Sequence, residues 1–345
     1  MDTGTRQHSA DFPRSTSLLT SLLKQVSRSF YLTLRALPRP IRSQIGVAYL
    51  LARASDTIAD TDIVPVERRL RALQELRLQI LNHEQTPLAF GELIHSQNSS
   101  AERMLLERTP EVLGLLSRFG PDDRERIRDV LAIITSGQQL DLSRFSQAGA
   151  SHVGALQSDE ELDDYTYRVA GCVGEFWTKM CRAHLFPNAK LDEAFSLANG
   201  VRFGKGLQLV NILRDLPRDL GQGRCYIPLD RLAAAKLSPT DLLQPANEPK
   251  FRPLYTSYLD QAENHLAAGW AYTNALPRRS VRIHLACAWP ILIGVKTIKK
   301  LRNAHMLDPH HRIKISRVEV RSLIVRSLVT YPSQIAWERL FSAVR

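Results

Sequence analysis

The chain of 345 residues has only four cysteines, and no two of them have CxxC spacing. This scarcity argues against a disulfide framework and against a zinc finger, so we expect reduced thiols. The longest apolar run, residues 285–295, contains Pro290 and is about half as long as the ~20 residues that a membrane-spanning helix needs. Residues 1–15 are polar and lack the hydrophobic segment of a signal peptide. We therefore expect a cytoplasmic protein without a transmembrane span.

Strand patterns are also absent. No alternation of apolar and polar residues is long enough for a strand, and no glycine-rich loop has phosphate-loop spacing. Apolar residues instead recur every three or four positions. The helices that this spacing predicts cover residues 16–34, 40–60, 65–81, 121–145, 159–185, 191–216 and 254–275.

The remaining stretches set the domain limits. The least ordered connections are expected at residues 83–109 and 245–253. Residues 1–16 are expected to be a disordered tail, and residues 17–345 one domain. The prediction is an all-α fold, a single domain of helices packed around a central cavity.

Positive charge exceeds negative charge. Lys and Arg number 46 against 35 Asp and Glu, which gives a net charge of +11. Such a chain favours anionic partners. The basic residues are spread along the sequence and no nucleic-acid-binding motif occurs, so we expect no nucleic-acid partner. A phosphorylated substrate or an anionic membrane surface fits better.

Two aspartate pairs carry the chemistry. Asp56 and Asp60 are four residues apart, as are Asp215 and Asp219. Residues with this spacing share one face of a helix. Two carboxylates side by side on a mostly buried helix are costly unless a cation neutralises them. Oxygen ligands of this kind suit Mg²⁺, and two facing pairs would hold Mg²⁺ ions around a diphosphate.

Polar residues flank the first pair. Tyr49 and Arg53 lie on the same helix face as Asp56 and Asp60, and the tract Ser27-Arg28-Ser29 offers hydroxyl and guanidinium donors for phosphate. The alternatives remain open: Arg53 as a structural ion pair, and the Ser-Arg-Ser tract as a solvated helix end.

The second pair belongs to a polar stripe. Gln208, Asn211, Asp215 and Asp219 follow one another at three- and four-residue steps through an otherwise apolar helix. Pro217 lies between the two aspartates and removes one helix hydrogen bond, which makes it a candidate for a kink.

Small residues stand between the two pairs. Gly171 and Gly174 lie inside a helical pattern, where glycine lowers helix stability. Two explanations stay open, close helix packing and room for a ligand.

Four stretches resemble the squalene and phytoene synthase family: SRSFYLTLRALP, YLLARASDTIAD, YTYRVAGCVGEFW and LQLVNILRDLPRDLGQGRCYIP. They occur in the family's order, and the resemblance covers about residues 20–300. It implies a single-domain isoprenoid synthase helical fold around a central apolar channel. By this resemblance, the expected Mg²⁺ ligands are Asp56, Asp60, Asp215 and Asp219, assisted by Asn211. The expected diphosphate-binding residues are Ser27, Arg28, Ser29, Tyr49, Arg53, Gln208, Arg214 and Arg224, and Tyr165 matches the tyrosine assigned to proton removal.

The chain departs from the family in two respects, of which one is Pro217 between Asp215 and Asp219. Ala59 and Arg218 stand where eukaryotic squalene synthases carry an additional Glu in each acidic motif. Metal binding then depends on four aspartates, and the number of bound ions stays open.

The resemblance implies a prenyl transfer reaction. Two farnesyl diphosphates would condense head to head to presqualene diphosphate, which NADPH would reduce to squalene. Without reduction the product would be dehydrosqualene or, from C20 donors, phytoene. The segment 312–317 resembles a basic stretch tied to NADPH use in squalene synthases, with Lys314 and Arg317 as candidate contacts. It favours squalene synthase; a catalytically inactive binding protein is the third alternative.

The last residues suggest a contact with lipid. Residues 318–345 predict a basic amphipathic helix, suited to lie on a membrane surface or to pack on the core. We expect a monomer whose partners are prenyl diphosphates, with peripheral membrane contact.

Overall fold

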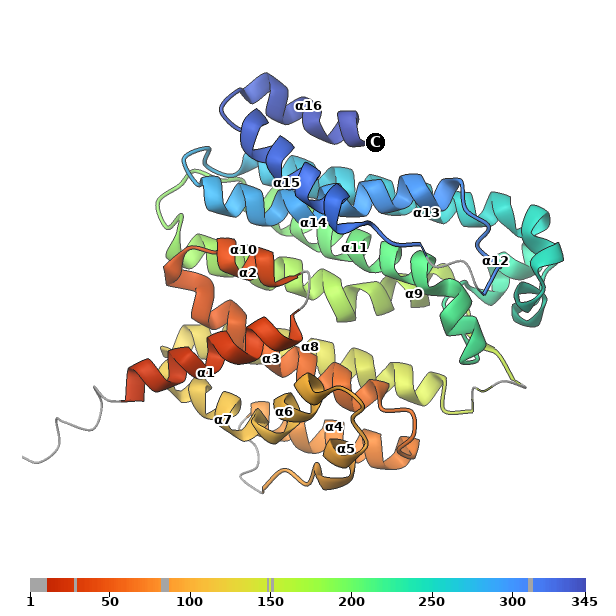
Figure 1. Ribbon diagram of the computed structural model, residues 1–345, viewed down its shortest axis with the longest axis horizontal. Coiled ribbons are helices and arrows are strands. Elements are labelled where there is room, and N and C mark those ends of the chain that lie inside the picture. The colour runs from red at the N-terminus through yellow and green to blue at the C-terminus, as the bar shows by residue number, and fades with distance from the viewer. Residues whose placement is uncertain (1–10, 28–29, 82–86, 148, 150–151, 310–312) are drawn as a thin grey trace, which may run out of the picture. The chain divides into compact units, whose positions relative to one another are not determined.

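Figure 1 shows the computed structural model of the chain. The structure describes residues 11–27, 30–81, 87–147, 149, 152–309 and 313–345. The chain forms two compact units, residues 1–142 and 143–345. Helices make up nearly all of the regular structure in both, which confirms the all-α prediction.

The first unit is built around α3. Pro40 lies in the first turn of this helix, a position that the fixed φ of proline favours. Its buried residues, Leu50, Leu51 and Ile58 among them, face α1, α4, α6 and α7. The helices of this unit are α1 (Asp11–Val26), α2 (Phe30–Ala36), α3 (Arg39–Asp60), α4 (Val66–Ile80), α5 (Gly91–His95), α6 (Ser100–Glu107), α7 (Thr109–Gly114), the 3₁₀ turn η1 (Leu115–Arg118) and α8 (Pro121–Arg144), which ends just past the boundary.

The second unit is built around α11, which packs against α10, α13 and α14. Two short strands, β1 (Gly154–Ala155) and β2 (Arg224–Cys225), pair in parallel with Gly154 opposite Arg224. The helices are α9 (Asp159–Thr166), the π-helical η2 (Tyr167–Gly171), α10 (Cys172–His184), α11 (Glu193–Gly221), α12 (Leu229–Ala234), the 3₁₀ turns η3 (Pro239–Leu243) and η4 (Pro245–Asn247), α13 (Glu248–Ala275), α14 (Val281–Arg302), α15 (Arg317–Thr330) and α16 (Gln334–Val344).

The N-terminal prediction needs correction at two points. Helix α1 begins at Asp11, so residues 11–16 are helical rather than part of a disordered tail; residues 1–10 lie outside the described residues. The single helix expected over 16–34 is two helices, because α1 ends at Val26. The hydroxyl and the backbone N–H of Ser27 both donate hydrogen bonds to the carbonyl of Leu23 at that helix end.

The two stretches expected to be irregular contain helices. Residues 83–109 include α5 and α6, which are too short to show several turns of apolar periodicity. Ser99 caps α6 by accepting a hydrogen bond from the backbone of Glu102 at 3.4 Å. Helix α13 starts at Glu248, earlier than expected, and continues past Pro253.

Helix α14 is long and apolar enough to cross a membrane by length and composition alone. However, 67% of its most apolar window is buried inside the protein, where it packs against α11 and α13. This is the environment of a core helix. Cys287 on α14 is a buried free thiol, as are the other three cysteines.

Residues 318–345 form two helices instead of the single one expected. Pro332 follows α15 closely and cannot continue it, and Ser333 caps α16. Helix α16 packs on the core: Trp337 is buried, stacks on Trp270 at 5.0 Å between ring centroids and donates its indole N–H to Asn274 at 2.8 Å.

The small residues of α10 and α11 bring two backbones into contact. A Cβ added to Gly174 would lie 1.8 Å from the carbonyl oxygen of Gly200, and one added to Gly204 would lie 2.1 Å from that of Ala170. At Gly174 the structure therefore favours close helix packing over room for a ligand.

We expect Gly174→Ala to destabilise the protein by about 3 kcal/mol or more, because the added methyl group meets backbone that cannot move aside. Gly221→Ala is the matched control, since no atom lies within 4 Å of its added Cβ. Urea unfolding followed by circular dichroism measures both. Equal stability of the two variants would contradict the close contact.

Candidate functional site

The first aspartate pair lies on the last two turns of α3. The Asp56 side chain is 47% exposed, and Asp60, the final residue of the helix, is exposed. The C-terminal end of a helix carries a partial negative charge, which disfavours carboxylates there. Both members of the pair are thus placed where a nearby cation stabilises them most.

Two side chains contact the Asp56 carboxylate. Gln138 on α8 donates its amide N–H to one carboxylate oxygen of Asp56. Arg53 reaches the other oxygen at 3.9 Å, and its second nitrogen donates to Glu102 at 2.5 Å. Arg53 is thus an ion-pair residue here, shared between two acids. Tyr49, half-buried, precedes it by one turn of the same helix.

This environment raises the pKa of Asp56 from 3.8 to about 7. Loss of hydration around the carboxyl is the main cause, and the negative charge of Asp60 adds to it. Arg53 and the hydrogen bond from Gln138 act in the opposite direction but do not offset the increase. The pair therefore favours binding of a proton or a metal cation.

Buried polar residues hold the end of α3 in place. The Arg69 guanidinium donates to the carbonyl of Ala59 at 2.7 Å, and Gln97 donates to the Thr61 hydroxyl at 2.7 Å. Sequence analysis missed these residues and also Glu102 and Gln138. They come from other helices, so no local spacing connects them to Asp56.

The second pair lies near the end of α11. Asp215 and Asp219 are both half-buried, as is Gln208, while Asn211 is exposed. Arg214 clamps Asp215 through two hydrogen bonds of 2.8 and 2.6 Å, and this contact raises the pKa of Arg214. Arg214 therefore contacts an expected metal ligand directly.

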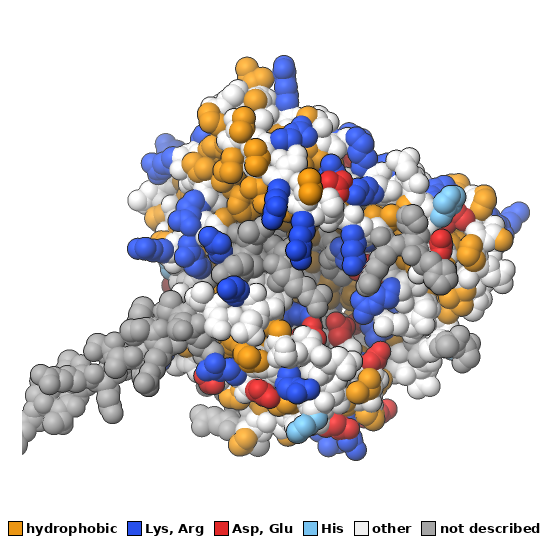
Figure 2. Space-filling model, in the orientation of Figure 1, with side chains coloured by type: hydrophobic (Ala, Val, Ile, Leu, Met, Phe, Trp, Pro, Cys, Tyr) orange, Lys and Arg blue, Asp and Glu red, His pale blue; other side chains and the backbone are white. Residues whose placement is uncertain are grey.

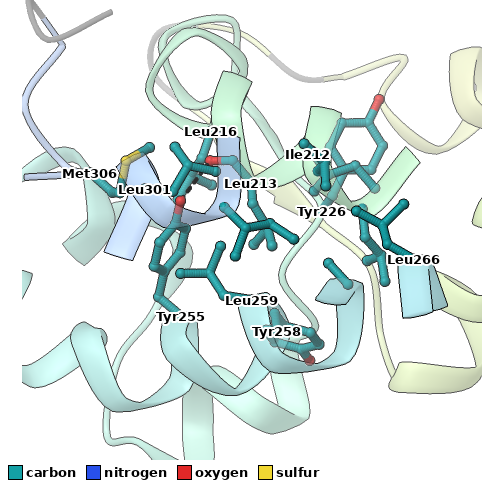
Figure 3. Close-up of a cluster of buried hydrophobic side chains, with 14 of the residues drawn as sticks. Ile212, Leu213, Leu216, Tyr226, Tyr255, Tyr258, Leu259, Leu266, Leu301 and Met306 are labelled. Carbon is teal, nitrogen blue, oxygen red and sulfur yellow. Dashed lines mark hydrogen bonds between the residues drawn. The ribbon is translucent and has the colours of Figure 1, made fainter. Parts of the chain in front are cut away.

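Pro217 leaves α11 continuous as far as Gly221. Because Pro217 has no N–H, the carbonyl of Leu213 loses its helical donor. The hydroxyl of Tyr255, a fully buried residue of α13, donates to that carbonyl at 3.1 Å (Figure 3). Tyr255 thus supplies the hydrogen bond that Pro217 cannot make in the part of α11 that carries the two aspartates.

Tyr165 lies two residues before the start of the π-helical turn η2, a distortion often found at functional sites. Its buried ring stacks on Tyr226 at 4.8 Å, and Phe145 packs edge-on against Tyr226 at 5.3 Å. Arg224 reaches this region through the β1–β2 pairing, where Gly154 donates to the carbonyl of Gly223 at 2.9 Å. Gly223 has φ of +78°, which glycine tolerates best.

The remaining expected residues differ in what the structure shows. Ser27 is buried with its hydroxyl bonded to Leu23, while Arg28 and Ser29 lie outside the described residues. Lys314 and Arg317 are exposed. Their charges suit the phosphates of a nucleotide.

The donor sets fit Mg²⁺. The described parts of the chain contain no cluster of three or more His, Cys, Asp or Glu side chains arranged for a metal ion. Mg²⁺ requires only one or two carboxylates and takes its other ligands from water and phosphate. Each aspartate pair meets that requirement.

A sequence profile described as squalene/phytoene synthase matches residues 23–319. The chain belongs to the squalene/phytoene synthase family. The earlier resemblance is thereby confirmed over most of the sequence.

Individual relatives are moderately similar. The squalene synthase of Schizosaccharomyces pombe is 25% identical over 92% of this chain, which spans 66% of that protein. The presqualene diphosphate synthase of Sinorhizobium fredii is 29% identical over 74% of this chain and 77% of the relative. The bifunctional lycopene cyclase/phytoene synthase of Gibberella fujikuroi is 28% identical over 70% of this chain, which spans only 40% of that protein.

Solved structures share the fold. A complex of TcSQS with the ligand BPH1237 is 21% identical, with a TM-score of 0.75 over 96% of this chain and 90% of that one. A dehydrosqualene synthase in complex with a ligand is 20% identical, with a TM-score of 0.65 over 94% of this chain and 99% of that one. The isoprenoid synthase helical fold is confirmed.

We expect Asp56→Asn to stabilise the metal-free protein near pH 8 and to have little effect near pH 4. The pKa of Asp56 is about 7 in the folded chain and 3.8 for a free carboxyl. Between pH 3.8 and about pH 7 the folded protein therefore binds a proton at Asp56 that the unfolded chain does not bind. The free energy of unfolding of the unmutated protein therefore falls as pH rises from about 4 to 7. In the Asn variant, which has no proton to lose at this position, this decrease does not occur. Melting temperatures measured in the presence of a chelator between about pH 4 and pH 8 test this effect. Asp62→Asn, at an exposed position, is the control. If the melting temperatures of Asp56→Asn and of the unmutated protein change with pH in parallel, the prediction is wrong.

We expect Tyr255→Phe to cost about 1–3 kcal/mol, because the Leu213 carbonyl is left buried without a donor. In a Pro217→Ala background the restored N–H can pair with that carbonyl, so the same change should cost little. Urea unfolding of the two single variants and the double variant gives the coupling energy. Additive costs would show that Tyr255 does not compensate for Pro217.

Proposed function

We propose that the chain is a squalene synthase. In this proposal it catalyses the Mg²⁺-dependent head-to-head condensation of two farnesyl diphosphates to presqualene diphosphate, followed by NADPH-dependent reduction to squalene. The observation that carries the proposal is the occurrence of two aspartate pairs, each on a well-packed helix, in a member of this family.

Both aspartate pairs would bind metal. Asp56 and Asp60, and likewise Asp215 and Asp219, would bind Mg²⁺ ions on the diphosphates, with Asn211 assisting. The bound Mg²⁺ would supply the positive charge that stabilises a departing diphosphate.

Cationic and polar side chains would bind and orient the diphosphates. Arg53 already lies beside Asp56, and Arg214 beside Asp215. We propose that their remaining N–H groups face phosphate oxygens when substrate binds. The other side chains proposed to bind diphosphate are Ser27, Arg28, Ser29, Tyr49, Gln208 and Arg224.

Tyr165 is the proposed proton acceptor. Its ring lies in a buried aromatic stack with Tyr226, which would keep water away from a carbocation. The phenol oxygen would take up the proton lost when the cyclopropane ring of presqualene diphosphate closes and would pass its own proton to the released diphosphate.

The product distinguishes the finer alternatives. The basic residues Lys314 and Arg317 support NADPH use by their charge alone. Similarity to a presqualene diphosphate synthase supports the first half of the reaction without the reduction. Similarity to phytoene and dehydrosqualene synthases keeps a carotenoid-type synthase as the second candidate.

Incubation of the purified protein with farnesyl diphosphate and Mg²⁺ should give squalene with NADPH and presqualene diphosphate or dehydrosqualene without it. Dehydrosqualene in spite of NADPH, or phytoene from geranylgeranyl diphosphate, would favour the second candidate. No product from either donor would favour a binding protein.

Asp56→Ala and Asp215→Ala should each lower turnover at least about 100-fold, since each removes a proposed ligand that stabilises charge in the transition state. Asp62→Ala serves as control, because Asp62 is exposed just beyond α3. Product analysis and circular dichroism are measured together. Full activity of Asp56→Ala with native helicity would refute the metal assignment.

A further inference from the structure

Helix α15 has apolar residues on both of its faces. On the inner face, Leu323 and Ser327 are buried, and the Ser327 hydroxyl accepts a hydrogen bond from the Trp289 indole of α14 at 3.0 Å. The inner face thus fixes the helix to the unit. The outer apolar residues are Val318, Val325, Leu328 and Val329, whose exposed fractions are 74%, 58%, 49% and 72%.

The exposed valines form one stripe. Val318, Val325 and Val329 are spaced seven and four residues apart, so they line up along the helix. Arg321 and Arg326 project on the two sides of this stripe and are both exposed. Neither arginine side chain has an ion-pair partner in the part of the chain that the structure describes.

The negative charge on this helix is paired with lysines. Glu319 is the acidic residue of α15, and it pairs with Lys300 at 2.8 Å and Lys296 at 3.5 Å, both on α14. Figure 2 shows orange side chains gathered at the top of the view, over α15 and α16, with Lys and Arg side chains among and below them. The outer face is therefore apolar with positive margins.

We propose that this outer face, defined as Val318, Arg321, Val325, Arg326 and Val329, docks on a lipid bilayer that contains anionic lipids. The valines would enter the boundary between head groups and acyl chains, and the flexible arginine side chains would reach lipid phosphates. Each arginine near an anionic bilayer contributes about a fivefold gain in binding.

The arrangement of charge favours a bilayer over a second copy of the chain. A symmetric contact between two outer faces would bring the arginines of one copy close to those of the other, and like charges oppose such a contact. A net charge of +11 adds to that repulsion and favours an anionic surface instead. The inference also rests on the proposed function, because prenyl substrates and a hydrocarbon product partition into membranes.

Vesicle flotation tests the proposal with the full chain. The probes are vesicles of phosphatidylcholine alone and of phosphatidylcholine with phosphatidylglycerol in equal parts. Arg321→Glu/Arg326→Glu should weaken binding to the mixed vesicles at least about 30-fold. Val325→Gln/Val329→Gln should weaken it about 10-fold or more. Arg71→Glu/Lys190→Glu, which makes the same charge change at exposed positions on α4 and after α10, should bind within a few-fold of the unmutated protein.

Two further outcomes would overturn the proposal. One is equal binding to both vesicle types, which would show that anionic lipid is not required, or equal loss in the control variant, which would show attraction by net charge alone. The other is a dimer in analytical ultracentrifugation that Val325→Gln/Val329→Gln dissociates, which would assign the face to a second copy. Product formation in detergent is assayed in parallel and should be unchanged in the α15 variants. Flotation without any prenyl product would retain the surface and refute the proposed function.

Discussion

The structure depends most on where it places carboxylates. Two pairs of aspartates occupy packed helices, and two carboxylates so close together are stable only with nearby positive charge or a proton. The units meet this constraint differently. Asp215 has two short hydrogen bonds from Arg214, whereas Asp56 has one long contact to Arg53 and a donor from Gln138. Loss of hydration around the Asp56 carboxyl and the negative charge of Asp60 outweigh these contacts, so the pKa of Asp56 increases to about 7.

The surroundings of each pair show what rigid support such a site needs. Arg69 and Gln97 donate hydrogen bonds to polar groups at the end of α3, and Tyr255 replaces the helix hydrogen bond that Pro217 cannot make. These contacts come from side chains that are themselves buried. They fix the backbone turns from which the aspartates project, so that the carboxylates need little reorganisation to bind a cation.

Long helices were predictable from sequence, because α3, α4, α8 and α11 bury one face each and repeat that pattern over several turns. Short helices such as α5 and α6 were not, and neither was α14, whose apolar residues show no single face. The positions of Tyr49, Arg53, Asp56 and Asp60 on one helix followed from spacing. The support from Gln138 and Tyr255 did not, since these contacts join positions 82 and 42 residues apart.

Helix α15 shows why the C-terminal prediction was only partly right. Apolar residues on both faces of a helix leave no clear amphipathic pattern, although each face alone is well defined. Because Leu323 and Ser327 already fix the inner face, the outer valines add nothing to folding while exposed to water. Exposed β-branched residues also lower helix propensity slightly. Helix α15 thus has exposed valines and a lowered helix propensity, and its acidic residue is paired with a lysine of α14. Contact with an apolar and anionic surface outside the chain best explains this combination.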